Sequence, residues 1–70
     1  MTTRGDYIYQ FITEALATGR TVYASTYLVT IAISKKHLDR GLVRVRDGHC
    51  EVARGKRWDS INGCSKIFAE

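Results

Sequence analysis

Two turn-forming dipeptides, Asp47-Gly48 and Asn62-Gly63, constrain the fold of this chain most strongly. Asp-Gly and Asn-Gly favour type I′ turns, in which both central residues take a positive φ, and such turns join antiparallel strands. Both dipeptides lie in the stretch 42–68, between short runs that contain β-branched and aromatic residues. The sequence therefore predicts a β-meander over this stretch.

A two-residue loop at Asp47-Gly48 also sets the register of the first hairpin. It pairs residues 43–46 with residues 49–52, so that Val43 faces Val52 and Arg44 faces Glu51. The apolar pairs then share one face and the charged pair lies on the other, as expected for a half-buried hairpin. A shift of one residue would bury the arginines, so this register is well specified.

The same reasoning at the second dipeptide pairs Trp58 with Ile67 and gives a less regular hairpin. Ile61 and Cys64 then share the opposite face, so apolar side chains lie on both sides of the ribbon. Either a bulge near residues 59–60 rotates the strand, or both faces are partly covered. The sequence leaves these two alternatives open.

An amphipathic helix is predicted over residues 7–18. Its apolar residues recur at helical spacing, at positions 8, 11, 12, 15 and 16. Asp6 is the expected N-cap and Gly19 the expected C-terminal stop, with residues 1–5 frayed. We expect the apolar stripe to pack against the apolar face of the meander.

Residues 20–33 are rich in β-branched and aromatic types, which indicates one bent strand or two strands broken near residues 24–26. A helix is the competing interpretation, but Thr and Val are poor helix formers. The apolar run 28–33 suggests a strand covered on both sides or an interface strand, which a homodimer would use. Ser34 is then expected to cap a short helix over residues 35–40 that ends at Gly41.

These elements predict a single α+β domain over residues 1–70. In it, the N-terminal amphipathic helix packs on a small, mostly antiparallel sheet that ends in the C-terminal β-meander. A chain of 70 residues buries only about 60% of its unfolded surface, so the core is small.

The formal net charge of +4 comes entirely from the second half of the chain. Basic residues cluster on the short helix, along one meander strand and at a hairpin tip, while tyrosines near the start suit a protein interface. Trp58 is either a stacking platform or part of the core. The candidate binding residues are Lys35, Lys36, Arg40, Arg44, Arg46, Arg54, Lys56, Arg57, Tyr7 and Tyr9.

Catalytic and metal-binding patterns are missing from the sequence. His37, His49, Cys50 and Cys64 do not have the spacing of a zinc site, and we expect two small buried thiols. There is no phosphate-binding glycine loop and no triad-like arrangement. We therefore expect a non-enzyme without cofactor or metal. Because no apolar run could span a membrane or act as a signal peptide, we expect a location in the cytoplasm of a bacterial host.

The run Gly55-Lys56-Arg57-Trp58-Asp59, followed by Ile61 in a compact proline-free chain, is similar to small accessory proteins encoded by bacteriophages and mobile elements. This resemblance concerns size and style over the whole chain and assigns no residue a role. It implies a non-enzymatic inhibitor of host machinery, of the anti-CRISPR or other anti-defence kind.

The sequence supports three hypotheses of function. The first is a small inhibitor that occludes a larger host protein or ribonucleoprotein complex through its basic face and tyrosines. The second is a DNA- or RNA-binding module that uses the basic face. The third is a sponge for an anionic nucleotide, held between basic residues at a dimer interface.

Overall fold

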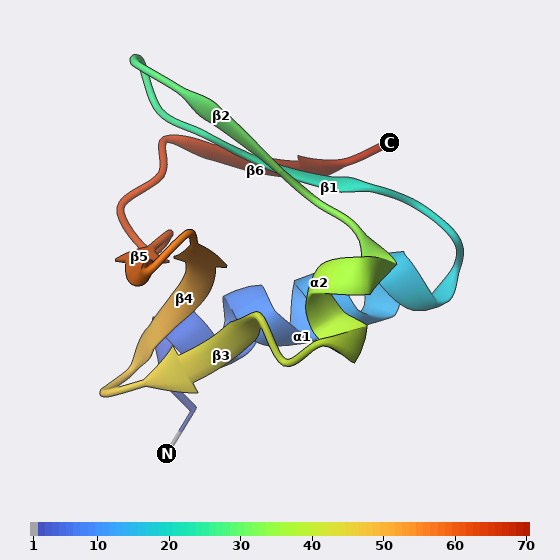
Figure 1. Ribbon diagram of the computed structural model, residues 1–70, viewed down its shortest axis with the longest axis horizontal. Helices are drawn as coiled ribbons and strands as arrows, with labels where there is room; N and C mark the ends of the chain where they lie inside the picture. The colour runs from blue at the N-terminus through green and yellow to red at the C-terminus, as the bar shows by residue number, and fades with distance from the viewer. Residues whose placement is uncertain (1) are drawn as a thin grey trace.

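The computed structural model describes residues 2–70 and shows an α+β fold, with two helices and two antiparallel three-stranded sheets in this part of the chain (Figure 1). The elements are, in chain order, α1 (Arg4–Ala17), β1 (Val22–Ser25), β2 (Thr30–Ile33), α2 (Lys35–Asp39), β3 (Val43–Arg46), β4 (His49–Arg54), β5 (Arg57–Ser60) and β6 (Lys66–Ala69). One sheet has the strand order β2-β1-β6 and the other β3-β4-β5. The predicted fold class is confirmed, with the strands divided between two sheets.

Helix α1 begins earlier than predicted, at Arg4, because Thr3 and Asp6 form a capping box. The Thr3 backbone amide donates to Asp6 Oδ2 over 2.9 Å, and the Asp6 amide donates to Thr3 Oγ1 over 3.2 Å. The prediction that Asp6 is the N-cap was therefore wrong, and so was the prediction of fraying at Thr3, Arg4 and Gly5, which cap and begin the helix. Met1, which was also expected to be frayed, lies outside the described residues. Hydrogen bonds from the Thr3 amide, and then from its hydroxyl, lower the pKa of Asp6 below its usual value.

The apolar stripe of α1 is buried as predicted, except at Phe11. Ile8, Ile12, Ala15 and Leu16 belong to the core, whereas Phe11 is 40% exposed. Phe11 lies at the margin of the stripe, roughly a quarter-turn from its centre, so it only edges the core. The helix ends as expected, with Thr18 as C-cap and Gly19 at a φ of 83°.

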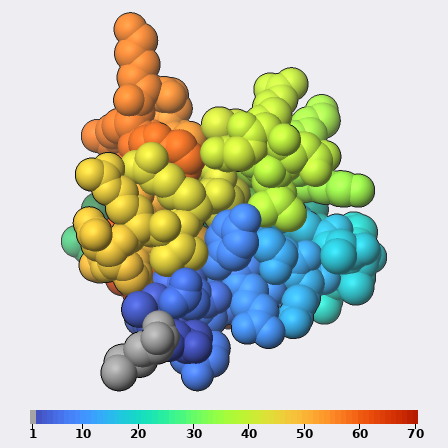
Figure 2. Space-filling view, turned by 90° about the horizontal axis from the view of Figure 1, so that it is seen from below, coloured from blue at the N-terminus to red at the C-terminus, as the bar shows by residue number. Residues whose placement is uncertain are grey.

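The first hairpin has the predicted register throughout. Val43 pairs with Val52 and Arg44 with Glu51, and the turn residues Asp47 and Gly48 have φ values of 52° and 77°. Two positive φ values at adjacent turn residues are what a type I′ turn requires. The turn lies over the start of α1, where the Gly5 amide donates to the Gly48 carbonyl over 3.0 Å. In Figure 2 this contact brings the yellow hairpin against the dark-blue start of the helix.

The predicted second hairpin at Asn62-Gly63 does not form. Instead, β5 pairs with β4 around a turn at Gly55-Lys56, so that Trp58 faces Ala53 rather than Ile67. The chain then leaves the meander, and β6 pairs with β1 in the other sheet. The meander therefore consists of β3, β4 and β5.

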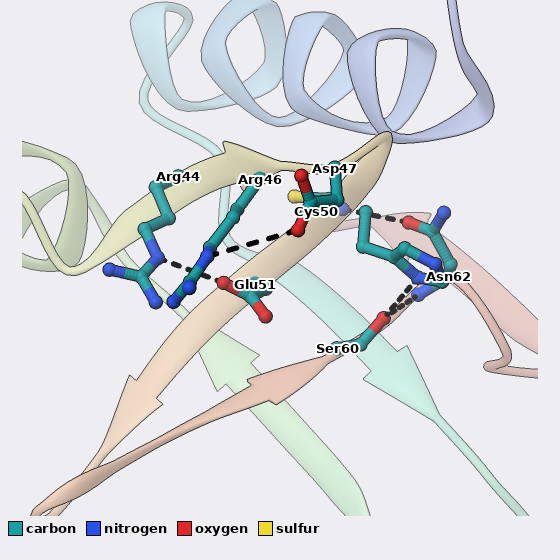
Figure 3. Close-up of polar contacts among 8 residues, drawn as sticks. Arg44, Arg46, Asp47, Cys50, Glu51, Ser60 and Asn62 are labelled. Atoms are coloured by element: carbon teal, nitrogen blue, oxygen red, sulfur yellow. Dashed lines mark hydrogen bonds and ion pairs between the residues drawn. The ribbon is translucent and has the colours of Figure 1, made fainter.

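Asn62 explains why the chain departs there. Its Oδ1 accepts from the Cys50 amide over 2.8 Å (Figure 3), and its Nδ2 donates to the Gly48 carbonyl over 2.8 Å. The side chain therefore clamps the end of the first hairpin. Neither Asn62 nor Gly63 has a positive φ. The turn is closed by the Cys64 amide donating to the Ile61 carbonyl, but it is not the type that pairs the flanking strands.

Residues 20–33 form two strands, which confirms the second of the two predicted alternatives. Strands β1 and β2 pair around a turn at residues 26–29, beyond the expected break near 24–26. Thr26 closes this turn, because its amide donates to the Val29 carbonyl and its Oγ1 accepts from the Leu28 and Val29 amides. The short helix α2 follows Ser34 as predicted, and Gly41 behind it has a φ of 69°.

The core lies between α1 and the inner faces of the two sheets. In Figure 1, α1 runs along the bottom, the β3-β4-β5 sheet lies at the left and the β2-β1-β6 sheet crosses the top. The largest fully buried side chains come from α1, β1, β2, β4 and the segment after β5: Ile12, Leu16, Ile33, Ile61, Val22, Val52 and Cys50. The inner and outer faces of the β3-β4-β5 sheet, defined by this core, decide where its charged residues lie.

Candidate binding site

The net positive charge is concentrated in two short segments. Residues 35–40 and residues 54–59 each contain three basic residues and one acidic residue. The rest of the chain carries five basic and five acidic residues, which cancel. The whole formal charge of +4 therefore belongs to α2 and to the turn between β4 and β5.

The fold brings these two segments to the same side of the molecule, around a cleft of about 580 Å³. In Figure 2 the yellow-green side chains of α2 and the orange side chains of the β4–β5 turn project from the same upper edge. We call this cleft the basic cleft. Its lining residues come from β2, α2, β4 and β5: Thr30, Ile31, Ala32, His37, Val52, Ala53, Arg54, Gly55 and Arg57.

Register explains why Arg54 and Arg57 face the cleft. They are paired across the β4–β5 turn, and they share the inner face of the sheet with Val52 and its partner Asp59. At the end of the sheet the core gives way to solvent, so the inner face becomes a wall of the cleft. Arg54 Nη1 and Arg57 Nε each lie 3.4 Å from one carboxylate oxygen of Asp59.

Asp59 orients the two arginines without neutralising both of them. One carboxylate balances one of the two guanidinium charges, and each guanidinium has five N–H donors. The side chain of Arg57 is 78% exposed and that of Arg54 is 43% exposed. The wall therefore keeps hydrogen-bond donors and one positive charge available for an anionic group.

Helix α2 contributes one residue, His37, to the lining of the cleft. The Ser34 amide donates to His37 Nδ1 over 3.1 Å, which fixes the imidazole at the start of α2. His37 also lines a shallow neighbouring hollow with Lys36 and Arg40, so the positive surface continues from the cleft along α2. Lys35 and Lys56, which do not line either hollow, lie on the same two segments.

Arg44 and Arg46 lie elsewhere, on the outer face of the β3-β4-β5 sheet. Arg44 Nε is 2.8 Å from Glu51 Oε1, and the Arg44 guanidinium carbon lies 3.9 Å from the ring centroid of Trp58 (Figure 3 shows the Arg44–Glu51 pair). Trp58 is therefore a half-buried residue of this outer face, covered by Arg44, and not part of the basic cleft. Of the three predicted basic groups, those in residues 35–40 and 54–57 therefore lie near one another, and the third, Arg44 with Arg46, lies apart from them.

The tyrosines are also dispersed. Tyr7 is exposed and lines a second groove with Ile8, Phe11 and Ile67, whereas Tyr9 packs against the core. Tyr23 stacks on Phe68 with ring centroids 5.4 Å apart. Neither Tyr7 nor Tyr9 is brought to the basic cleft.

Sequence reasoning missed the exposed turn between β1 and β2. Tyr27 is 93% exposed and Leu28 is 78% exposed. The apolar run that includes Leu28 was expected to be a strand covered on both sides or an interface strand, whereas Leu28 lies in a turn. The signal was Thr26, a residue type whose hydroxyl readily accepts from backbone amides two or three residues on. The turn leads directly into β2, which borders the basic cleft.

The cysteines remain thiols. Cys50 is buried, and burial raises its pKa to about 11, while partial burial also raises the pKa of Cys64. Within residues 2–70, no group of three or more His, Cys, Asp or Glu side chains is placed to hold a metal ion.

Comparison with known proteins finds no matching family model, no matching curated protein and no matching solved structure. No helix in the described part of the chain is long and apolar enough to cross a membrane. A function for this chain therefore has to be inferred from the geometry of the basic cleft.

Proposed function

We propose that this protein is a small non-enzymatic binding protein that occludes an acidic surface of a larger protein or ribonucleoprotein. One observation carries the proposal: both segments that hold the entire net charge contribute to the lining of the basic cleft, Arg54 and Arg57 from one and His37 from the other. Charge gathered in a concave site steers an oppositely charged partner and favours it over other partners. An inhibitor of this kind blocks its target by covering it, so it needs no catalytic group.

Two features favour protein as the main component of the partner. The basic cleft is lined by aliphatic, hydroxyl and basic side chains, with His37 as its one aromatic ring. Proteins that bind single-stranded nucleic acid usually present aromatic rings on which bases stack. The exposed Tyr27 and Leu28 lie in the turn that precedes β2, a strand that lines the cleft. They offer apolar contact area of the kind found in protein interfaces.

The resemblance to bacteriophage and mobile-element accessory proteins suggests the class of target. An anti-defence inhibitor must meet a nucleic-acid-handling complex, and a basic cleft suits either an acidic protein surface or a site that normally holds nucleic acid. We propose a bacterial defence complex as the target, in the cytoplasm of the host.

The test is capture of a partner from a bacterial lysate by the immobilised protein, followed by a variant comparison. The double variant Arg54→Ala/Arg57→Ala removes two charges from the basic cleft. The matched control Arg44→Ala/Arg46→Ala removes two charges from the opposite face. A partner lost with the first variant and kept with the second supports the proposal, whereas equal capture by both variants contradicts it.

Nucleic-acid binding is the second candidate, favoured by the continuation of positive charge from the cleft along α2. In that case the log of the affinity for a DNA or RNA oligonucleotide falls with the log of salt concentration, with a slope of about −0.7 to −0.9 per phosphate contacted. Titration at two salt concentrations with the same pair of double variants measures this slope. A flat titration at low salt removes the candidate.

A further inference from the structure

Strand β2 differs from the other strands that lie at sheet edges. The two sheets have four edge strands in residues 2–70, namely β2, β6, β3 and β5. β3 carries Arg44 and Arg46, β5 carries Arg57 and Asp59, and β6 carries Lys66, and such charges discourage pairing with another chain. β2 has the sequence Thr-Ile-Ala-Ile, with neither a charge nor a proline.

The basic cleft borders the open backbone edge of β2. Thr30, Ile31 and Ala32 all line it, although consecutive side chains on a strand point to opposite faces. Three consecutive residues of β2 therefore reach the cleft, so the backbone of this strand borders it as well as its side chains. Because no residue of β1 lines the cleft, it lies along the side of β2 that has no neighbouring strand.

An edge strand of this kind leaves alternate N–H and C=O groups unpaired, and they can hydrogen-bond to an added strand. The wall opposite this edge carries Arg54 and Arg57, with Asp59 as the acid between them. Backbone pairing on one side and positive charge on the other together define one kind of occupant. That occupant is an extended peptide with acidic side chains.

We propose that β2 accepts an acidic segment of the partner protein as an additional strand, with its carboxylates paired to Arg54 and Arg57. Main-chain hydrogen bonds supply affinity in this mode, and the flanking side chains supply specificity. The exposed Tyr27 and Leu28 extend the contact beyond the end of β2. This inference rests on the proposed function, since it names the part of the partner that the basic cleft recognises.

The test uses a fluorescein-labelled peptide of about six residues, alternating Val and Glu, which is a common strand length. Two further peptides of the same sequence carry N-methyl groups at alternate residues, one peptide for each of the two possible phases. N-methylation removes strand hydrogen bonds and keeps every charge. Fluorescence anisotropy measures affinity, and amide chemical shifts locate the site. We expect shifts in Thr30–Ile33, and a loss of affinity of tenfold or more in one N-methylation phase.

The arginines are tested with the same peptide. Arg54→Ala/Arg57→Ala is expected to weaken binding about tenfold, whereas the control Arg46→Ala, on the outer face, changes it less than twofold. Amide spectra of each variant confirm that it is folded. Two further probes are titrated in the same way. A single-stranded oligonucleotide tests nucleic-acid binding, and a Val/Lys peptide of the same length tests whether the peptide must be acidic.

The outcomes separate this inference from the proposed function. Equal binding of the peptide and both of its N-methylated forms overturns strand addition but leaves an acidic partner in the basic cleft. Failure of the Val/Glu peptide to bind, or shifts that avoid β2, also overturns strand addition. If the oligonucleotide binds and neither the Val/Glu nor the Val/Lys peptide does, nucleic-acid binding replaces strand addition. The proposed function itself is tested separately, by the capture of a partner from a bacterial lysate. Failure of that capture contradicts the proposed function, whatever the peptides show.

Discussion

The turn at Asp47-Gly48 joins two paired strands, whereas the turn at Asn62-Gly63 connects strands of different sheets. Both turns reverse the chain, but only the first has positive φ at both central residues. In the second, the side chain of Asn62 binds the Cys50 amide and the Gly48 carbonyl instead of supporting a local hairpin. In this chain, the dipeptide whose polar side chain binds distant backbone groups is the one that does not pair its flanking strands.

The two turns are also physically connected through one atom. The Gly48 carbonyl oxygen accepts from the Gly5 amide over 3.0 Å and from Asn62 Nδ2 over 2.8 Å. The start of α1, the first hairpin and the segment after β5 therefore meet at Gly48. Substitutions around this point test how much each turn depends on the other.

The largest effect is expected from Gly5→Ala. An added Cβ at Gly5 would lie 2.5 Å from the Gly48 carbonyl oxygen and 2.8 Å from the Cys50 nitrogen, so backbone must move and the Gly5–Gly48 hydrogen bond is lost. We expect a loss of about 3 kcal/mol in the free energy of unfolding, measured by urea denaturation. Gly63→Ala is the matched control, because its Cβ would meet nothing within 4 Å. Equal stability of the two variants would show that α1 does not depend on this close approach.

Asn62→Ala is expected to cost about 2 kcal/mol, because it removes the acceptor of the part-buried Cys50 amide and leaves the Gly48 carbonyl with the Gly5 amide as its remaining donor. Amide hydrogen exchange at Cys50 should become faster. Ser60→Ala is the control, since Ser60 Oγ lies 3.4 Å from the Asn62 amide and its closer contact, with His49 Nδ1 over 3.0 Å, is exposed to solvent. A loss below about 0.5 kcal/mol for Asn62→Ala would mean that solvent replaces the clamp.

Local patterns in the sequence predicted the elements that depend on neighbouring residues. The 43–52 register follows from Asp47-Gly48 and alternation, and the buried stripe of α1 follows from helical spacing. The pairing of β6 with β1 joins residues more than forty positions apart, and nothing local in 66–69 indicates that partner. The prediction that Phe11 is buried was wrong for a related reason, because the width of the buried stripe depends on what packs against α1.

The candidate site shows the same division. Clusters at 35–40 and 54–57 were visible in the sequence, but only the fold brings them to one cleft and leaves Arg44 and Arg46 on the outer face. The open edge of β2 could not be predicted, because an edge is a property of sheet order. The exposed Tyr27 required recognising that Thr26 closes a turn.

Asp47→Ala is expected to have a smaller effect, about 1 kcal/mol. Asp47 has a φ of 52°, and this conformation is unfavourable for residues with a side chain unless they are Asn or Asp. Asp47→Asn is the matched variant that keeps a residue suited to a type I′ turn, and we expect it to retain stability. Urea denaturation compares them, and equal stability of the Ala and Asn variants would contradict a role for turn conformation. Because the partners of the Asn62 side chain are the Cys50 amide and the Gly48 carbonyl, the Ala substitution at position 47 should leave the second turn intact.

The smallest expected effect concerns Asp6, whose capping box holds the start of α1 next to the Gly48 turn. Its pKa is lowered in the folded protein, so its carboxylate stabilises the fold above the usual pKa of 3.8, and that contribution is lost as the pH falls through the lowered value. The wild-type protein should therefore be more stable than Asp6→Ala at pH values above this range. The difference should narrow below the usual pKa and close once Asp6 is protonated in both states. Thermal unfolding of both proteins across this range measures it, with Asp39→Ala as the control for loss of a helix carboxylate. A difference that does not change with pH would show that the negative charge of Asp6 makes no contribution to holding α1 against the first hairpin.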